Sequence, residues 1–240
     1  MKLCIFVFSI LATHAVLAED VVTKNFNAAE LKSLELTNMS GDIKVTAIDG
    51  DLASVTANKI SFEHKCKLTT EQQGNKLVVS VRSTDLFDSA ICKVHFDVKV
   101  PKQIAMNISV GSGDLEVVGT KGQLKFKTGS GDAKIVAEVD SLQVDMGSGD
   151  LQIDGLVGSG DLKTGSGDID LSYTAAPQTG SLNISSGSGS ATISLPSGSK
   201  LDTSFQSGSG ELLNEIGNSK NAKFRISMKA GSGDLRIKKK

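Results

Sequence analysis

The chain has 240 residues, of which 39% are hydrophobic and 4% aromatic, and its formal net charge is −1 at pH 7. A near-neutral chain with no Trp and one Tyr lacks the basic patches and stacking aromatics that nucleic-acid binding needs, so nucleic acid is excluded as a partner. The 25 glycines, each costing about 1 kcal/mol in a helix interior, argue against a helical protein.

Residues 1–18 have the pattern of a secretory signal peptide. Lys2 precedes an apolar run over residues 3–11, and Val16-Leu17-Ala18 forms a small-residue cleavage site before Glu19. The apolar run is shorter than the roughly 20 residues that span a bilayer, and the mature chain has no second long apolar stretch. We therefore expect an exported protein, periplasmic or at the cell surface, without a transmembrane segment. A buried N-terminal strand or helix is the alternative.

Cleavage would remove Cys4 and leave Cys66 and Cys92 as the two cysteines of the mature chain. Because exported proteins meet an oxidising environment, this pair predicts a disulfide. Closing a loop of this length stabilises the fold by about 3 kcal/mol in the chain-entropy model. A zinc site with His64 and His95 is the alternative. It is disfavoured because Cys92 and His95, three residues apart, would point to opposite faces of a straight strand.

Residues 19–103 predict a part with longer strands. Apolar and polar residues alternate over residues 77–82 and 94–100, as in half-buried strands, and Pro101 ends the second run. Met39-Ser40-Gly41-Asp42-Ile43 resembles the motif that dominates the rest of the chain. Met39 lies 72 residues before Gly111, which is four times the 18-residue spacing found later, and this suggests a shared register.

A Gly-Ser-Gly-Asp motif, or a one-residue variant of it, recurs through residues 104–240. Copies begin at Gly111, Gly129, Gly147, Gly165, Gly187, Gly208 and Gly231, at intervals of 18 to 23 residues. Within each unit, apolar residues alternate after the motif and again before the next copy, which predicts two short strands per unit. The second turn of the unit is expected at residues 119–122 in one repeat and 158–161 in another. Asn214 and Gly160 depart from the apolar pattern.

Fixed spacing of this kind indicates a stacked architecture. We predict an all-β fold, a β-solenoid of the parallel β-helix or β-roll kind with repeats of about 18–23 residues. Residues 19–240 would form a single elongated domain, in which residues 19–103 precede the repeats of residues 104–240. An antiparallel β-sandwich, in which each unit is a hairpin, is the alternative.

The motif has a physical explanation at the corners of a stack. Glycine permits a positive φ, and Ser and Asp side chains can bond to backbone amides that a turn leaves unpaired. The residues predicted to form the repeat turns are Gly111, Gly113, Asp114, Gly129, Gly131, Asp132, Gly147, Gly149, Asp150, Gly165, Gly167, Asp168, Gly231, Gly233 and Asp234.

Aligned aspartates also raise the possibility of Ca²⁺ between turns, with Asp161 at the opposite corner. The motif lacks the Gly-Gly-x-Gly-x-Asp form and the nine-residue period of calcium-binding β-rolls, and Ser190 and Glu211 replace Asp in two copies. Amide-bonding aspartates are therefore favoured, and no cofactor or metal is expected. A calcium-stabilised β-roll stays an alternative.

No catalytic set is recognisable in the sequence. His64 and His95 are the only histidines of the mature chain, and the Gly-Ser-Gly turns fit neither a nucleophile elbow nor a phosphate-binding loop. We expect a non-catalytic protein. A carbohydrate-active β-helix enzyme is the alternative by fold analogy alone, and it would need paired carboxylates with aromatic side chains in a groove.

Val98-Lys99-Val100-Pro101-Lys102, followed by Ser109-Val110-Gly111-Ser112-Gly113-Asp114-Leu115 and its repeats, resembles the bacterial putative-adhesin family, a domain of unknown function. The resemblance covers roughly residues 30–237. It implies an exported, β-helical protein of the cell envelope with a structural or interaction role. Its partner would be an unidentified protein or glycan at the envelope. The resemblance supplies no catalytic or binding residues.

Overall fold

The computed structural model describes residues 20–85 and 91–240, so the predicted signal peptide lies outside the described residues. The described chain forms one continuous 18-stranded sheet and a single 3-10 turn, η1 (Ala28–Glu30). The strands are β1 (Val21–Asn27), β2 (Ser33–Ser40), β3 (Ile43–Ile48), β4 (Leu52–Phe62), β5 (Cys66–Gln73), β6 (Lys76–Ser83), β7 (Cys92–Pro101), β8 (Ala105–Ser112), β9 (Leu115–Ser130), β10 (Ala133–Ser148), β11 (Leu151–Ser166), β12 (Ile169–Tyr173), β13 (Gly180–Ser188), β14 (Ala191–Leu195), β15 (Asp202–Ser209), β16 (Leu212–Asn214), β17 (Phe224–Ser232) and β18 (Leu235–Lys239).

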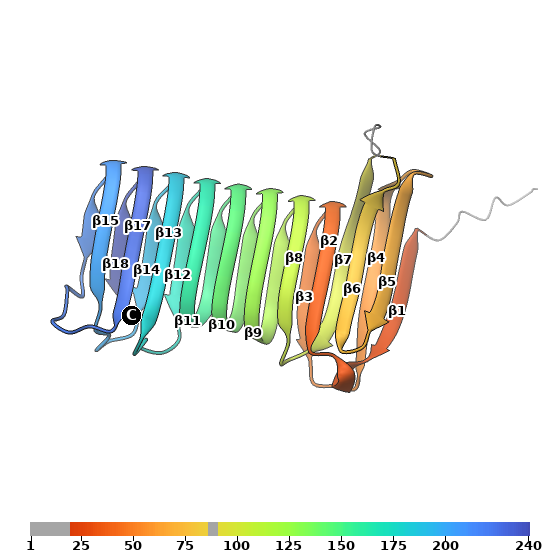
Figure 1. Ribbon diagram of the computed structural model, residues 1–240, viewed down its shortest axis with the longest axis horizontal. Coiled ribbons are helices and arrows are strands. Elements are labelled where there is room, and N and C mark those ends of the chain that lie inside the picture. Colours follow the sequence, from red (N-terminus) through yellow and green to blue (C-terminus); the bar gives the residue numbers. More distant parts are fainter. Residues whose placement is uncertain (1–19, 86–90) are drawn as a thin grey trace, which may run out of the picture.

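The sheet is folded along two long edges, so that it encloses its own core between a front and a rear face (Figure 1). The front sheet has the order β5-β6-β2-β8-β9-β10-β11-β13-β17-β15. The rear sheet has the order β1-β4-β7-β3-β9-β10-β11-β12-β14-β18-β16. The long strands β9, β10 and β11 bend over the lower edge of Figure 1 and contribute to both sheets. We call this lower edge the loop edge.

We call one turn of the solenoid, which consists of one front strand segment and one rear strand segment, a coil. Strands of neighbouring coils pair in parallel and in register. On the rear sheet, for example, Ala133 of β10 lies between Leu115 of β9 and Leu151 of β11. Antiparallel pairs join β1 with β4, β4 with β7 and β5 with β6, all before the repeats. The prediction of a β-solenoid is therefore confirmed, and the hairpin alternative is wrong for the repeats.

Two coils are stacked out of sequence order. The coil made of β2 and β3 lies directly against β8 and β9, so that Leu34 pairs with Met106 and Ser40 with Ser112. Residues 72 positions apart in these two coils are thus direct neighbours. The intervening residues 49–104 form the strands at the N-terminal end of the solenoid, which we call the N-terminal rungs. At the other end, β17 and β18 lie between the coil of β13 and β14 and the coil of β15 and β16.

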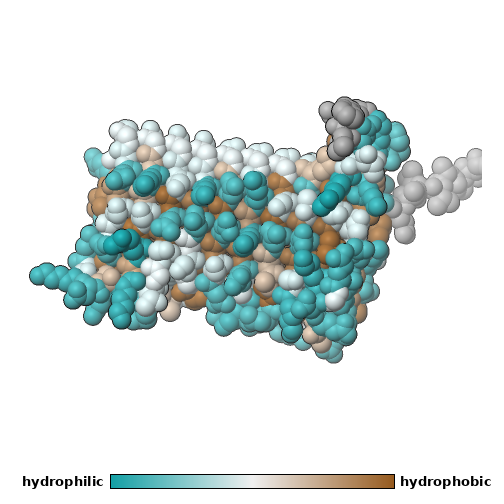
Figure 2. Space-filling model, in the orientation of Figure 1, coloured by the Kyte–Doolittle hydropathy of each residue, from teal (hydrophilic) through white to brown (hydrophobic). Residues whose placement is uncertain are grey.

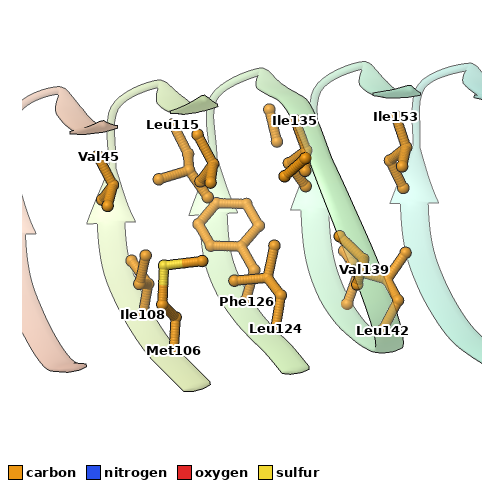
Figure 3. Close-up of a cluster of buried hydrophobic side chains, with 14 of the residues drawn as sticks. Val45, Met106, Ile108, Leu115, Leu124, Phe126, Ile135, Val139, Leu142 and Ile153 are labelled. Atoms are coloured by element: carbon orange, nitrogen blue, oxygen red, sulfur yellow. The ribbon is translucent and has the colours of Figure 1, made fainter. Parts of the chain in front are cut away.

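The inward positions of each coil form one continuous core. Figure 3 shows Val45, Leu115, Ile135 and Ile153 from the rear sheet facing residues of the front sheet, including Phe126. All five are at most 2% exposed, and each buried aliphatic side chain contributes about 1.5–3 kcal/mol of burial free energy. The apolar residues of the alternating sequence pattern are therefore the ones that line the inner faces of the two sheets.

Gly160 occupies an inward position where neighbouring coils have leucine. It pairs with Leu142 on one side and Leu182 on the other. A Cβ at Gly160 would lie 2.8 Å from Leu182 Cδ1 and 3.8 Å from Leu156 Cδ2. Leu156 is itself fully buried. Side chains from neighbouring positions thus occupy the space that a residue larger than glycine would need.

The loop-edge turn of β11 differs from the sequence prediction. Ser159 and Asp161 pair with Ser141 and Gln143 within the front sheet, so residues 158–161 are not the turn, and Asp161 is not at a corner. The turn lies instead near Gly155, whose φ is 121°. The Tyr173 hydroxyl donates to the Gly158 carbonyl at 3.2 Å, and burial raises the pKa of that phenol above its ordinary value.

Polar side chains bond across both ends of the stack. At the N-terminal end, Lys24 Nζ of β1 donates to the Thr70 carbonyl of β5 at 3.0 Å and so bridges the two sheets. At the C-terminal end, Asn214 takes an inward position opposite Ile237 and donates to Thr203 Oγ1 at 3.1 Å. This departure from the apolar pattern is explained because terminal units of a stack need a polar outer face.

Candidate functional site

The Gly-Ser-Gly-Asp motifs form the upper edge of the molecule in Figure 1, which we call the corner ridge. In Figure 2 this edge is a pale band of intermediate hydropathy. The corner aspartates are linked from coil to coil. The Asp132 N–H donates to Asp114 Oδ1 at 2.9 Å, and the Asp150 N–H donates to Asp132 Oδ1 at the same distance. The links Asp42–Asp114, Asp150–Asp168, Asp168–Ser190, Ser190–Asp234 and Asp234–Glu211 complete a ladder with side chain-to-amide distances of 2.8–3.1 Å.

Glycine is required twice in each corner, for different reasons. A Cβ on the first glycine, as at Gly147, would lie 2.3 Å from the Gly129 carbonyl oxygen of the previous coil. The second glycine, as at Gly149, has φ 125°, and its Cβ would lie 2.2 Å from the Gly131 carbonyl oxygen. Close stacking at strand spacing, rather than ligand binding, therefore accounts for both glycines.

The residues predicted for the repeat turns all lie on the corner ridge. Each corner Asp of the first coils uses Oδ1 to accept an amide N–H, which is the interaction expected from the sequence. Residues 20–85 and 91–240 contain no group of three His, Cys, Asp or Glu side chains arranged to hold a metal ion. Because the corner Asp side chains bond to amides of the next coil, we interpret the ridge as structural.

The predicted disulfide is confirmed. Cys66 of β5 and Cys92 of β7 are bonded, with a Cα–Cα distance of 5.7 Å, and they join the front and rear sheets at the N-terminal end. The zinc alternative is wrong because each sulfur is bonded to the other. His95 Nδ1 instead accepts the Asp42 N–H at 3.1 Å, so it takes the place of a corner side chain at the start of the ladder.

A shallow depression of about 300 Å³, which we call the front hollow, opens in the middle of the front sheet. Gln143, Asp161 and Asn183 are neighbours on successive strands and are all exposed. The shorter side chains of Ser141, Ser159 and Ser181 lie beside them and leave the depression open. The lining residues are Ser141, Leu142, Gln143, Ser159, Gly160, Asp161, Ser181 and Asn183. Around it, Figure 2 shows hydrophilic and intermediate side chains with hydrophobic atoms visible between them.

The front hollow offers hydrogen-bonding groups in fixed positions. Ser159 Oγ accepts the Ser181 N–H at 3.2 Å, and Asn183 Nδ2 lies 3.4 Å from Ser181 Oγ. The amide of Gln143 and the carboxylate of Asp161 point outward on the same row. Planar amides and carboxylates donate to and accept from hydroxyl groups with defined geometry. Such a row presents donors and acceptors of the kind that hydroxyl groups bind.

A hollow on the rear sheet holds the nearest match to the enzyme alternative. Its volume is about 310 Å³, and Asp150, Asp168 and Asp170 line it together with Arg236. Asp150 and Asp168 already accept ladder amides, and Arg236 pairs with Asp234 at 2.6 Å. Neither histidine nor an aromatic side chain is among its lining residues.

On the same sheet, Lys44 and Glu116 form an exposed ion pair at 2.7 Å. A hydrogen bond and the opposite charge hold the pKa of Glu116 below its ordinary value and raise the pKa of Lys44. Both side chains remain open to solvent, so this pair is a surface interaction.

Sequence reasoning did not find the front hollow. Its residues come from three coils and, apart from Leu142 and Gly160, belong to the outward positions that vary between repeats. The available signal was the repeat register, since Gln143 and Asp161 occupy the same position 18 residues apart.

The fold and the corner ladder define the protein as a parallel β-solenoid with two flat sheets and glycine-serine corners. The Toastrack DUF4097 family model matches residues 73–239, and the chain belongs to this family. No curated protein matches the chain. Within residues 20–85 and 91–240, no helix has the length and apolar character needed to cross a membrane.

Several solved structures are similar to the chain. A putative lipid binding protein from Parabacteroides distasonis has a TM-score of 0.51 at 16% identity, covering 91% of this chain and 97% of that one. A putative adhesin from Bacteroides fragilis has a TM-score of 0.46 at 14% identity, covering 92% and 98%. A putative cell adhesion protein from Clostridium sporogenes has a TM-score of 0.41 at 15% identity, covering 92% and 99%. At these identities the likeness concerns the fold alone.

Proposed function

We propose that the protein is an exported, non-catalytic protein of the cell envelope that binds a glycan through its front sheet, in the manner of an adhesin. The front hollow carries this proposal. Gln143, Asp161 and Asn183 stand in register on a sheet that spans the molecule, so their spacing is set by the strands. A ligand with repeated hydroxyl groups matches a surface with repeated amide and hydroxyl groups.

A glycan is favoured over a protein partner by the chemistry of the same surface. Energetically dominant positions in protein interfaces are enriched in Trp, Tyr and Arg seated in desolvated pockets. The front hollow is lined by serine, amide and carboxylate side chains, with Leu142 as its one large apolar residue. A protein partner at the envelope is therefore the second choice.

Export is supported by two features of the chain. The disulfide joins β5 to β7, and such bonds persist in oxidising compartments. Residues 1–18 have the pattern of a signal peptide. We further propose that residues 19–240 act as one domain, with the N-terminal rungs and the repeats sharing one core. Periplasm and cell surface are both compatible with these features.

Purified protein and an array of envelope polysaccharides test the proposal. We expect a glycan to bind wild type, and the double variant Gln143→Ala with Asn183→Ala to bind it about thirtyfold more weakly, since two neutral hydrogen bonds contribute about 1 kcal/mol each. Gln73→Ala is the matched control, because this exposed amide lies on β5 at the N-terminal end of the front sheet and lines neither the front hollow nor the rear one.

Two results would contradict the proposal: no envelope glycan binds wild type, or the double variant binds as wild type does. The bound polysaccharide should also keep its length during long incubation with the protein. Shortened chains would favour the carbohydrate-active alternative, and mutation of Asp168 and Asp170 in the rear hollow would then locate the activity.

A further inference from the structure

A second depression, of about 360 Å³, opens at the loop edge near the C-terminal end, and we call it the loop hollow. Three loops meet there: the loop after β12, the loop after β14 and the loop that joins β16 to β17. They lie along the lower edge in Figure 1. Its lining includes Gln178, Thr179, Lys200, Asn221 and Lys223.

The loop hollow is positively charged. Lys200 and Lys223 are exposed, no carboxylate is among the lining residues, and neither lysine has an ion-pair partner within the described part of the chain. The surrounding sequence has the same sign. Residues 196–240 contain nine Lys and Arg against four Asp and Glu, whereas residues 103–195 contain five against eleven. A cleft lined by one sign of charge concentrates ligands of the opposite sign.

The backbone of the loop hollow is fixed before any ligand arrives. The Gly180 N–H donates to the Lys223 carbonyl at 3.1 Å, and the Ser219 N–H donates to the Leu201 carbonyl at 2.9 Å. The loop before β17 is thus bonded to both of the other loops. Asn221 has φ 62°, the one non-glycine residue with positive φ among the described residues, and asparagine adopts this conformation more readily than most. A preformed site loses less entropy on binding.

The loop hollow and the front hollow meet at the start of β13. Thr179 lines the first and Ser181 lines the second, with only Gly180 between them. An extended ligand can therefore contact both. We propose that the loop hollow binds the anionic group of an acidic glycan, a carboxylate or a sulfate, while its sugar hydroxyls contact the front hollow. The inference rests on the proposed function and names the class of its partner.

Lipid and nucleic acid fit the loop hollow less well. None of the large exposed apolar residues of the described chain lines it, whereas membrane-surface segments insert apolar side chains. No aromatic ring is available among its lining residues to stack on a base. The C-terminal end of the loop edge is covered by hydrophilic side chains in Figure 2. Amide, hydroxyl and ammonium groups together suit an acidic sugar.

The test uses a galacturonic acid tetramer and its methyl ester, which has the same backbone without the charges, and dextran sulfate with neutral dextran as the sulfate arm. Calorimetry of the purified protein should show the charged member of at least one pair binding about tenfold more tightly, with affinity falling at 0.5 M salt. Lys200→Gln and Lys223→Gln should each weaken that binding about threefold to fivefold, the upper range for one exposed charge pair.

Three controls make the result decisive. Lys200→Arg keeps the charge and should bind as wild type does. Lys99→Gln removes an exposed lysine from the rear sheet and should have no effect. The circular dichroism spectrum of each variant should match wild type, because both lysines of the loop hollow are on the surface.

The inference is overturned if the uncharged members bind as tightly as the charged ones, or if no charged member binds. It is also overturned if Lys99→Gln weakens binding as much as Lys200→Gln. Tighter binding to phosphatidylglycerol vesicles than to either acidic glycan, lost in Lys223→Gln, would assign the loop hollow to a membrane surface. The proposed function is tested separately, because it fails when the Gln143 and Asn183 variants leave glycan binding unchanged.

Discussion

Replacing Gly149 by alanine tests the explanation of the corner motif, because this position combines two independent constraints. Its φ of 125° costs an L-residue about 1–2 kcal/mol. The added Cβ would lie 2.2 Å from the Gly131 carbonyl oxygen, which is backbone and cannot rotate away. Overpacking of this kind costs about 1–3 kcal/mol. We therefore expect Gly149→Ala to lower the free energy of unfolding by about 2–5 kcal/mol, a large share of the 5–15 kcal/mol typical of domains.

Three further glycines separate the two terms. Gly147→Ala adds only the close approach, 2.3 Å from the Gly129 carbonyl oxygen, and should cost about 1–3 kcal/mol. Gly74→Ala adds only a positive φ of 61° in open space and should cost about 1–2 kcal/mol. Gly50→Ala adds neither and should be neutral or slightly stabilising.

Urea denaturation followed by circular dichroism gives the four free-energy differences. The cost at Gly149 should approach the sum of those at Gly147 and Gly74. The reasoning is refuted if Gly149→Ala costs no more than Gly74→Ala, since the contact between coils would then contribute nothing.

Asp132→Ala removes the acceptor of the Asp150 N–H and should cost about 1 kcal/mol in urea denaturation, whereas Asp132→Asn keeps an acceptor oxygen and should cost less; equal costs would contradict the amide ladder. A chelator should leave the thermal midpoint of wild type unchanged, and a lowered midpoint would restore the calcium alternative. Replacing Cys66 and Cys92 together by serine should cost about 3 kcal/mol, and a reductant should destabilise wild type but not this variant. Lys44 lowers the pKa of Glu116, so the pair stabilises the fold above about pH 4.3 and the effect disappears as pH falls through the lowered folded pKa. Glu116→Gln should therefore lower the thermal midpoint slightly at pH 7 and progressively less as the pH falls below about 4.3, and an effect that does not change with pH would contradict the ion pair.

The fold class was predictable because one local rule is repeated along the chain. Each unit has the same apolar positions, and each corner has glycines where the coils approach most closely, so the periodicity alone indicated a stack. The corner chemistry followed for the same reason. Asp132 and Asp150 occupy identical positions 18 residues apart, and a side chain at a stacked corner has an amide of the next coil within reach.

The Gly-Ser-Gly-Asp motif gave a wrong prediction at one place. Residues 158–161 read Gly-Ser-Gly-Asp like a corner, but the repeat register places Gly158 36 residues after Gly122 and Gly155 36 residues after Gly119. Gly119 and Gly122 in one coil, and Gly155 and Gly158 in the other, therefore mark the loop-edge turn. Asp161 consequently falls on the open front sheet, where it lines the front hollow instead of a corner. Position within the repeat, rather than the letters themselves, decides the role of a residue here.

The front hollow and the loop hollow could not be predicted from periodicity. Each combines outward residues or loops from three coils, and outward side chains obey no common rule because solvent accepts most polar residues. The order of the coils was equally hidden, since every repeat offers the same edges to a neighbour. Two inward residues of β15 and β16 distinguish that coil, because Thr203 and Asn214 stand beside Ile226 and Ile237 of the neighbouring coil.

Thr203 and Asn214 make this coil more polar at its inward positions than the coil of β17 and β18, although its inward Leu212 stays 43% exposed. This difference explains why the last coil in the sequence is not the last in the stack. An apolar coil at the end would expose its inward side chains and leave a free sheet edge, which is a template for further strand pairing. The coil of β17 and β18 has inward Ile226, Met228 and Leu235, all buried, and it gains neighbours on both sides by lying one place further in. The coil of β15 and β16 then closes the end. The Thr203 N–H on its outer edge donates to Asn218 Oδ1 at 3.0 Å, so a side chain occupies a group that an added strand would need.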